Sequence, residues 1–260
     1  MFDFKRTQTR KHLNTQTLRI TTSFYAPPTA IREGAYVVLP EQEAAHAVRV
    51  LRKRPGDEIV VVDGEGGWYR VRLDQIDRRQ AAGEILETRR EVGEPGYDLS
   101  IGLALLNNRN RFETFLEKAV ELGVREVLPL MTHRTARVPF KQERGRKILL
   151  AAMKQCGRSR LVRLAEPQPL ANVLHDTSAD LAFIGHERTA PEHNLAVALA
   201  GQPSFRTIRI LIGPEGGFTE DELAEAGQAG YAPVSLGPRR LRAETAALVA
   251  ASTVMITRSH

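Results

Sequence analysis

The sequence predicts an α/β fold in which a small β barrel precedes a larger domain built on a parallel sheet. Three observations support this prediction. Short strand signals with tight turns fill residues 21–92, strand and helix patterns alternate over residues 98–260, and the Gly- and Pro-containing segment 93–97 has the composition of a linker. Residues 1–20 stand apart as a basic extension that we expect to be disordered.

Length and composition place the chain among globular proteins. It has 260 residues, of which 42% are hydrophobic and 26% charged, and it contains no apolar run long enough to span a membrane and no secretory signal. We therefore expect an intracellular, cytoplasmic protein without a membrane partner. The single cysteine, Cys156, excludes an internal disulfide and leaves no cysteine pair for zinc or redox chemistry, so we expect a small buried thiol.

Positive charge is concentrated at the start of the chain. The net charge is +6, and residues 1–20 hold five Lys and Arg residues against Asp3 alone, so the rest of the chain is close to neutral. Global charge is thus weak evidence for a nucleic-acid partner, and local clusters must supply it. The extension itself fits an organelle transit peptide, a nucleic-acid arm or an extension from an upstream start codon.

The first domain is predicted to be a barrel that carries one basic helix. Residues 37–39 and 58–62 are predicted strands, and the glycine-rich turn 63–67 joins the second of them to an alternating strand at 68–73, which makes a β hairpin. Residues 41–52 are predicted to form a helix with one apolar face. Its other face would present the cations Arg49, Arg52 and Lys53.

The second domain is predicted to alternate strands with helices. Residues 99–106 form an almost continuous apolar run, typical of a strand buried on both faces, and the apolar positions from Phe112 to Val120 have helical spacing before Gly123. Further strands are predicted at 126–131, 181–184, 208–212 and 233–236, and further helices at 141–155, 192–199, 220–229 and 242–257. Such alternation is typical of a parallel sheet covered on both faces.

Two glycine-containing loops follow strands of this sheet. They lie in Ile210-Leu-Ile-Gly-Pro-Glu-Gly-Gly-Phe218 and in Leu236-Gly-Pro-Arg-Arg-Leu-Arg-Ala-Glu-Thr-Ala-Ala247. A parallel sheet brings both loops to its carboxyl edge, where α/β proteins bind ligands. The first loop could equally be a plain turn before a helix capped by Thr219. Neither loop has the spacing of a phosphate-binding loop, which disfavours a nucleoside triphosphate.

Three arginines in the second loop stand where a helix is about to begin. Helix amino termini and arginines both favour anionic groups, so this loop suits a phosphate or a carboxylate, although each arginine could also be a solvated loop charge. The histidines are scattered without ligand spacing, so no metal site is predicted.

Together the two loops closely resemble the signature of the ribosomal RNA small subunit methyltransferase E family. The resemblance covers roughly residues 21–258. Further matching motifs, in chain order, are His46-Ala-Val-Arg-Val-Leu-Arg52, Pro55-Gly56, Asp63-Gly64, Arg111-Phe-Glu113, Glu117-Lys-Ala-Val-Glu-Leu-Gly123, Arg134 and Gln155-Cys-Gly-Arg158.

The resemblance implies a fold and an activity that composition and periodicity do not reveal. It implies a PUA-like RNA-binding barrel at residues 21–92 and a SPOUT methyltransferase domain at 98–260, whose trefoil knot holds S-adenosylmethionine. It further implies methylation of N3 of a uridine in 16S rRNA, on the assembled small ribosomal subunit and by a homodimer. Because the sulfonium of the cofactor activates the methyl group, this chemistry needs no metal.

The resemblance also assigns roles to residues. The implied cofactor contacts are Leu211, Ile212, Gly213, Glu215, Gly216, Leu236, Gly237, Leu241, Thr245 and Ala246. The catalytic candidates are Arg242, which would contact the uracil or its phosphate, and the carboxylates Glu215 and Glu244, either of which could be the base or purely structural. The candidate RNA contacts are Arg49, Arg52, Lys53, Arg109, Arg111, Arg134, Lys154, Arg158, Arg239 and Arg240.

Two other classes of function stay open on the sequence alone. The chain could be another SPOUT methyltransferase, acting on a ribose 2′ oxygen or on a guanine, or a non-catalytic RNA-binding or ribosome assembly factor. The sequence leaves open the identity of the base, the target nucleotide, the geometry of the dimer and the role of residues 1–20.

Overall fold

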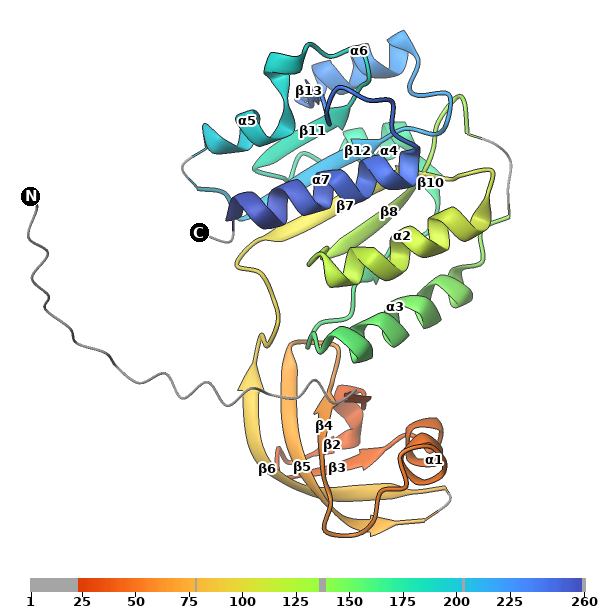
Figure 1. Ribbon diagram of the computed structural model, residues 1–260, viewed down its shortest axis with the longest axis vertical. Helices are drawn as coiled ribbons and strands as arrows, with labels where there is room; N and C mark the ends of the chain where they lie inside the picture. The colour runs from red at the N-terminus through yellow and green to blue at the C-terminus, as the bar shows by residue number, and fades with distance from the viewer. Residues whose placement is uncertain (1–22, 78, 136–138, 203, 259–260) are drawn as a thin grey trace, which may run out of the picture.

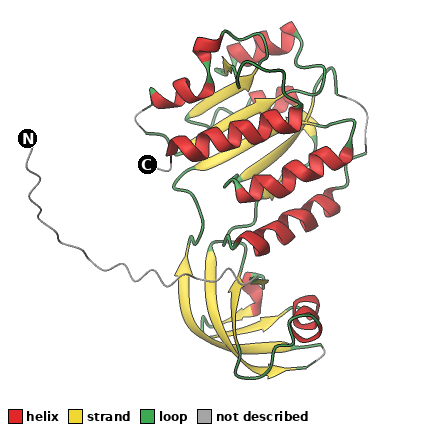
Figure 2. Cartoon of the chain, viewed as in Figure 1, coloured by secondary structure: helices red, strands yellow, loops and turns green. Residues whose placement is uncertain are grey.

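The structure is a computed structural model that describes residues 23–77, 79–135, 139–202 and 204–258. It consists of two domains stacked along the long axis, an amino-terminal β domain and a carboxy-terminal α/β domain (Figure 1). The colours of Figure 2 show that strands dominate the first and that helices enclose the strands of the second. The basic extension predicted at residues 1–20 lies outside the described residues.

The amino-terminal domain is a curved six-stranded sheet with the strand order β1-β4-β5-β6-β3-β2. Two register shifts between β5 and β6 bend these long strands, and Gly83 lies at the bend because a Cβ there would come 2.1 Å from the carbonyl oxygen of Arg72. The predicted hairpin is confirmed, since β4 and β5 pair antiparallel. The strands are β1 (Phe24–Tyr25), β2 (Ile31–Arg32), β3 (Tyr36–Leu39), β4 (Glu58–Val62), β5 (Gly67–Ile76) and β6 (Ala81–Arg90).

The helix of this domain, α1 (Glu41–Arg49), is shorter than predicted. The amide of Val50 donates to the carbonyl of His46 in the last turn, and Arg52 then adopts a left-handed conformation with φ of 52°. The prediction that Arg52 and Lys53 continue one helical face with Arg49 is therefore wrong, because both follow the helix in a loop. Arg49 and Arg52 are nevertheless exposed and lie close together in the chain.

The carboxy-terminal domain contains the predicted parallel sheet, with the order β10-β8-β7-β12-β11-β13 and with β9 beside β8. Every pairing within it is parallel. Its strands are β7 (Asp98–Ala104), β8 (Glu126–Met131), β9 (Arg163–Leu164), β10 (Gln168–Pro169), β11 (Leu181–Gly185), β12 (Thr207–Ile212) and β13 (Ala232–Val234). Its helices are α2 (Arg109–Glu121), α3 (Gln142–Cys156), α4 (Leu170–Leu174), α5 (Leu195–Ala200), α6 (Glu220–Gln228) and α7 (Ala243–Arg258).

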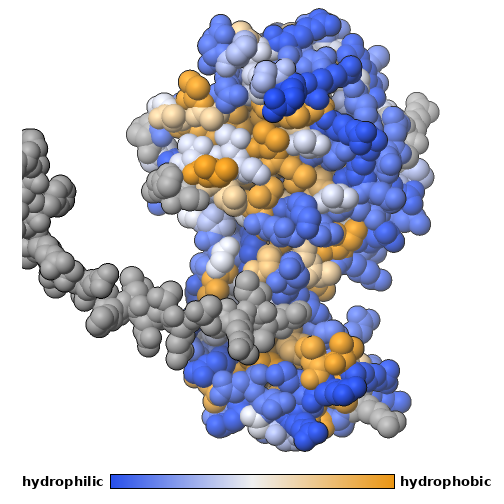
Figure 3. All heavy atoms as spheres, in the orientation of Figure 1, coloured by the Kyte–Doolittle hydropathy of each residue, from blue (hydrophilic) through white to orange (hydrophobic). Residues whose placement is uncertain are grey.

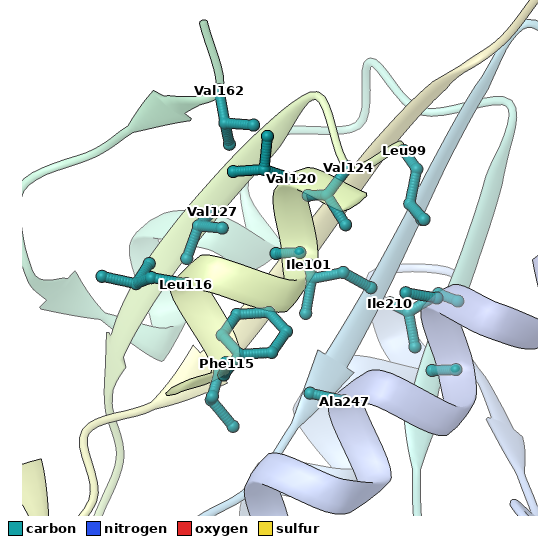
Figure 4. Packing of buried hydrophobic residues seen from close by; sticks show 14 of the residues in the cluster. Leu99, Ile101, Phe115, Leu116, Val120, Val124, Val127, Val162, Ile210 and Ala247 are labelled. Carbon is teal, nitrogen blue, oxygen red and sulfur yellow. The ribbon is translucent and has the colours of Figure 1, made fainter. Parts of the chain in front are cut away.

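Helices cover both faces of this sheet, as the continuous apolar run of β7 predicts. One face packs against α2, α3, α5 and α7, and the other against α4 and α6. Figure 4 shows Ile101 and Ile210, from neighbouring strands, beneath Phe115 of α2 and Ala247 of α7. Ala247, Ala250 and Ala251 of α7 are fully buried, so this helix lies close against the strands, as its apolar sequence predicts.

Two ion pairs fix the junction between the domains. Lys154 pairs with Glu43 of α1 at 2.5 Å, and its carbonyl accepts hydrogen bonds from Ser23. Arg158 pairs with Glu94 of the linker at 2.6 Å, with both side chains about 95% buried.

The prediction that Arg158 contacts RNA is wrong, because its side chain is buried at this junction. Its guanidinium also donates to the carbonyls of Val120 and Val124, so a buried network rather than a solvent-facing surface holds it. Lys154 is mostly buried as well, and its ammonium is engaged by Glu43, so it too joins the domains instead of facing RNA. Cys156, in the last turn of α3, is half-buried, and burial raises the pKa of its thiol.

Among the described helices, none combines the length and the apolar character needed to cross a membrane.

Candidate cofactor and RNA site

The two glycine loops predicted from the sequence lie on the walls of one cavity of about 600 Å³ at the carboxyl edge of the sheet. The first loop follows β12 and the second follows β13. Because β11 lies between these strands in the sheet, the loop after β11 also enters the cavity. Ligand cavities of enzymes commonly have this size and this place in parallel sheets.

The first loop is a tight turn between β12 and α6. The amide of Gly217, with φ of 69°, donates to the carbonyl of Pro214. A Cβ on Gly213 would lie 3.2 Å from both the backbone carbon of Gly217 and the ring of Phe218, so a side chain would disturb the turn. Thr219 then caps α6 as predicted, and the cap and the ligand loop are therefore consecutive parts of one segment.

Glu215 and Arg134 hold this loop to its neighbours. The carboxylate of Glu215 accepts a hydrogen bond of 3.3 Å from the amide of Asn107, which follows β7. The guanidinium of Arg134, which follows β8, donates to the carbonyls of Gly216 at 2.7 Å and Phe218 at 3.1 Å. Glu215, which we predicted as a catalytic candidate, lines the cavity and is exposed.

The second loop carries its arginines into the start of α7. Gly237 has φ of 120°, which only glycine adopts without strain, and the Ser235 hydroxyl accepts a hydrogen bond from its amide. Arg242 precedes the first residue of α7, and its carbonyl accepts the helical hydrogen bond from Ala246. Its side chain is exposed and lines the cavity at the amino terminus of a helix, which favours negative charge.

The third loop, Gly185 to Arg188, was missed by the sequence analysis. The amide of His186 donates to the carbonyl of Val234, and Glu187 lies 3.6 Å from Arg240 of the second loop. Gly185 is its single glycine, so no glycine-rich signature marks this loop. The signal that could have found it is the strand predicted at 181–184, whose carboxyl end must lie at the same edge as the other two.

Most predicted cofactor residues line the cavity, and two do not. Leu211 is fully buried in the core beside Gly102, and Thr245 is exposed on the first turn of α7. The residues that line it are Ile212, Gly213, Glu215, Gly216, Leu236, Gly237, Leu241 and Ala246.

The other carboxylate that we predicted as a catalytic candidate, Glu244, does not line the cavity. Its side chain is largely buried and lies 3.6 Å from the guanidinium of Arg111, so the first turns of α7 and α2 are tied together. This pairing gives a structural role to both residues. Arg109, by contrast, is exposed at the first position of α2, and Arg239 and Arg240 are exposed in the second loop.

Comparison with known proteins agrees with this architecture. A family model described as an RNA methyltransferase domain matches residues 94–255, and one described as an RNA methyltransferase PUA domain matches residues 39–86. A crystal structure of a probable rRNA-methyltransferase from Porphyromonas gingivalis superimposes with a TM-score of 0.79 at 33% identity, covering 92% of this chain and 99% of that one.

Two relatives carry the same name. The chain is 32% identical to Ribosomal RNA small subunit methyltransferase E of Synechocystis sp. over 85% of its length and 73% of the relative's. Ribosomal RNA small subunit methyltransferase E of Neisseria gonorrhoeae, whose crystal structure is bound to S-adenosyl methionine, superimposes with a TM-score of 0.78 at 29% identity, covering 90% of this chain and 97% of that one.

Fold, cavity and matches together define an RNA methyltransferase domain of the SPOUT type joined to a PUA domain. Within that class, the chain belongs to the ribosomal RNA small subunit methyltransferase E family. The predicted family is thereby confirmed, and so is the predicted α/β fold with a parallel sheet preceded by a PUA domain.

Proposed function

We propose that this protein transfers a methyl group from S-adenosylmethionine to N3 of a uridine in 16S rRNA. The observation that carries the proposal is the cavity formed by the two glycine loops, in a chain of this family. We further propose that the substrate is the assembled small subunit in the cytoplasm, and that the carboxy-terminal chain forms the trefoil knot implied by the resemblance.

The residues around the cavity fit this cofactor. Gly213 and Gly216 line the cavity without a side chain, and a Cβ at either position would crowd Phe218 or Arg134, so the loop keeps this tight turn only with glycine there. Ile212, Leu236 and Leu241 offer apolar surface to a purine, while carboxylates and arginines of the three loops offer partners for the charged amino-acid end. When bound, S-adenosylmethionine supplies a methyl group that its sulfonium has already activated.

The chain's own residues then have two tasks, to orient the uracil and to remove its N3 proton. Glu215 is our candidate base, since its carboxylate lines the cavity and the Asn107 amide orients it. Arg242 is our candidate for stabilising the negative charge that develops on the uracil as the proton leaves. Exposed cations on both domains, Arg49, Arg52, Arg109, Arg239 and Arg240, would bind the phosphate backbone.

Nucleoside mass spectrometry of 16S rRNA tests the proposed reaction. A strain that lacks this protein should lose 3-methyluridine, and the purified enzyme should restore it on isolated small subunits. Loss of a ribose-methylated nucleoside or a methylguanine instead would identify another SPOUT activity. Unchanged rRNA, together with no binding of S-adenosylmethionine in calorimetry, would identify a binding factor.

Replacing Gly213 with alanine should weaken cofactor binding about tenfold. The added Cβ would meet Gly217 and Phe218 at 3.2 Å, so the loop must shift by a few tenths of an ångström. Calorimetry with S-adenosylmethionine measures the change. Gly227→Ala is the matched control, because a Cβ on that α6 residue has nothing within 4 Å, and its affinity should equal that of the unmodified protein.

We propose that the family's homodimer forms through the outer face of α7. Ile256 on α7 and Val197 on α5 are more than 60% exposed, and the two helices pack together. Apolar side chains gather over α7 on the face seen in Figure 3. Ile256→Asp should convert the dimer into a monomer in light scattering, whereas a dimer that persists would place the interface elsewhere.

A further inference from the structure

A short turn after β8 lies directly against the first glycine loop. Within this turn the amide of Thr132 donates to the Thr135 hydroxyl at 2.9 Å, and the amide of Thr135 donates to the carbonyl of Thr132 at 3.1 Å. Residues 132–135 are thus held by their own hydrogen bonds. They form a fixed platform at the carboxyl edge of the sheet, beside the cavity.

Arg134 uses this platform to hold the glycine loop. One guanidinium nitrogen donates to two carbonyls, those of Gly216 and Phe218, which lie on either side of the left-handed Gly217. Hydrogen bonds from a charged donor are roughly twice as strong as neutral ones. The aliphatic part of the same side chain lies 3.3 Å from where a Cβ of Gly216 would be, so it also packs against the loop.

Glu222 provides a second connection between the same two segments. One oxygen of its carboxylate accepts from the amide of His133 at 2.8 Å, and the other accepts from the amide of Thr219 at 2.8 Å. The capping box of α6 is therefore shared with the turn after β8. The glycine loop is held at its middle by Arg134 and at its end by Glu222.

We propose that Arg134 and Glu222 are positioning residues that fix the glycine loop in its cofactor-binding conformation. This role differs from the RNA contact that the sequence suggests for Arg134. It rests on the proposed function in so far as the loop's ligand is S-adenosylmethionine. We call the hydrogen bonds of Arg134 and Glu222 to the glycine loop the clamp. The clamp holds the loop before the cofactor binds, so its loss would weaken cofactor binding more than the chemical step.

The test compares Arg134→Ala with Arg134→Lys and with Arg146→Ala, an exposed arginine of α3 that pairs with Glu143. We expect Arg134→Ala to raise the dissociation constant and the KM for S-adenosylmethionine about tenfold or more, with kcat at saturating cofactor changed less than threefold. Arg134→Lys, which keeps one cationic donor, should recover part of the affinity. Arg146→Ala should match the unmodified protein.

Hydrogen exchange on the protein without cofactor separates this proposal from the proposed function. Arg134→Ala and Glu222→Gln should each exchange faster at the amides of Gly213 and of residues 215–219, while β7 keeps its protection. Unchanged exchange in the loop would overturn the clamp, as would normal cofactor affinity combined with weaker RNA binding. If the unmodified protein fails to bind S-adenosylmethionine, the proposed function is wrong, and the exchange rates still decide the clamp.

Discussion

Replacing Arg158 with alanine is expected to lower the free energy of unfolding by about 3–5 kcal/mol, the range found when one partner of a buried ion pair is removed. The substitution would strand the Glu94 carboxylate, which is about 95% buried, without its cation. It would also remove the donors to two carbonyls at the carboxyl end of α2. Urea denaturation of the purified protein measures the loss.

The neighbouring Arg160 is the matched control for this change. Arg160 pairs with Glu91, but these side chains are 29% and 48% exposed, so Arg160→Ala should cost about 1 kcal/mol or less. Equal stability losses for the two variants would show that burial does not strengthen the Arg158 pair. A small loss for Arg158→Ala with clear loss of RNA affinity would restore the RNA contact that the sequence suggested.

The role of Arg158 could not be predicted from the sequence. A pattern of residue types reveals charge, but the exposure of Arg158 depends on Glu94, which lies 64 positions earlier in the chain. The regular elements were predictable because their signal is local. Nearby residues alone carry the apolar spacing that predicts α2 and the apolar run that predicts β7, and both elements lie where they were expected.

Short and polar elements gave no comparable signal. Strands β9 and β10 have two residues each and α4 has five, too few for any period to appear. Strand β6 was missed because its outer half, Glu84 to Arg90, is charged and largely exposed. The strands β6, β9 and β10 form because their neighbours in the sheet provide hydrogen-bond partners, a consequence of tertiary structure rather than of local propensity.

Part of the candidate site was predictable, because glycines after a buried strand indicate a loop whose backbone can approach a ligand closely. Both glycine loops were found in this way. The loop at 185–188 was not found. It lines the cavity because β11 lies between β12 and β13, and no local sequence pattern reveals the order of strands in a sheet. The pairing of Glu244 with Arg111 has the same origin, since α2 and α7 meet only in the folded chain.

Replacing Arg242 with alanine is expected to lower kcat about 100- to 1000-fold, the range observed when one stabilising donor is removed from an enzyme site. The side chain lines the cavity at the amino terminus of α7, where a cation and the helix amides would together stabilise negative charge on the uracil. The cofactor's affinity should change less than threefold, because the glycine loops keep their structure. Single-turnover methylation of small subunits and calorimetry with S-adenosylmethionine measure the two quantities.

Arg239→Ala is the matched comparison for Arg242→Ala. Arg239 is exposed in the same loop and also lines the cavity, but it lies four residues before the helix begins. Arg239→Ala should therefore weaken RNA binding, with a reduced dependence on salt, while kcat at saturating RNA stays within about threefold. If Arg242→Ala behaves in this way too, Arg242 binds phosphate and does not stabilise the transition state. Charge stabilisation at the uracil would then have to come from another donor at this edge of the sheet.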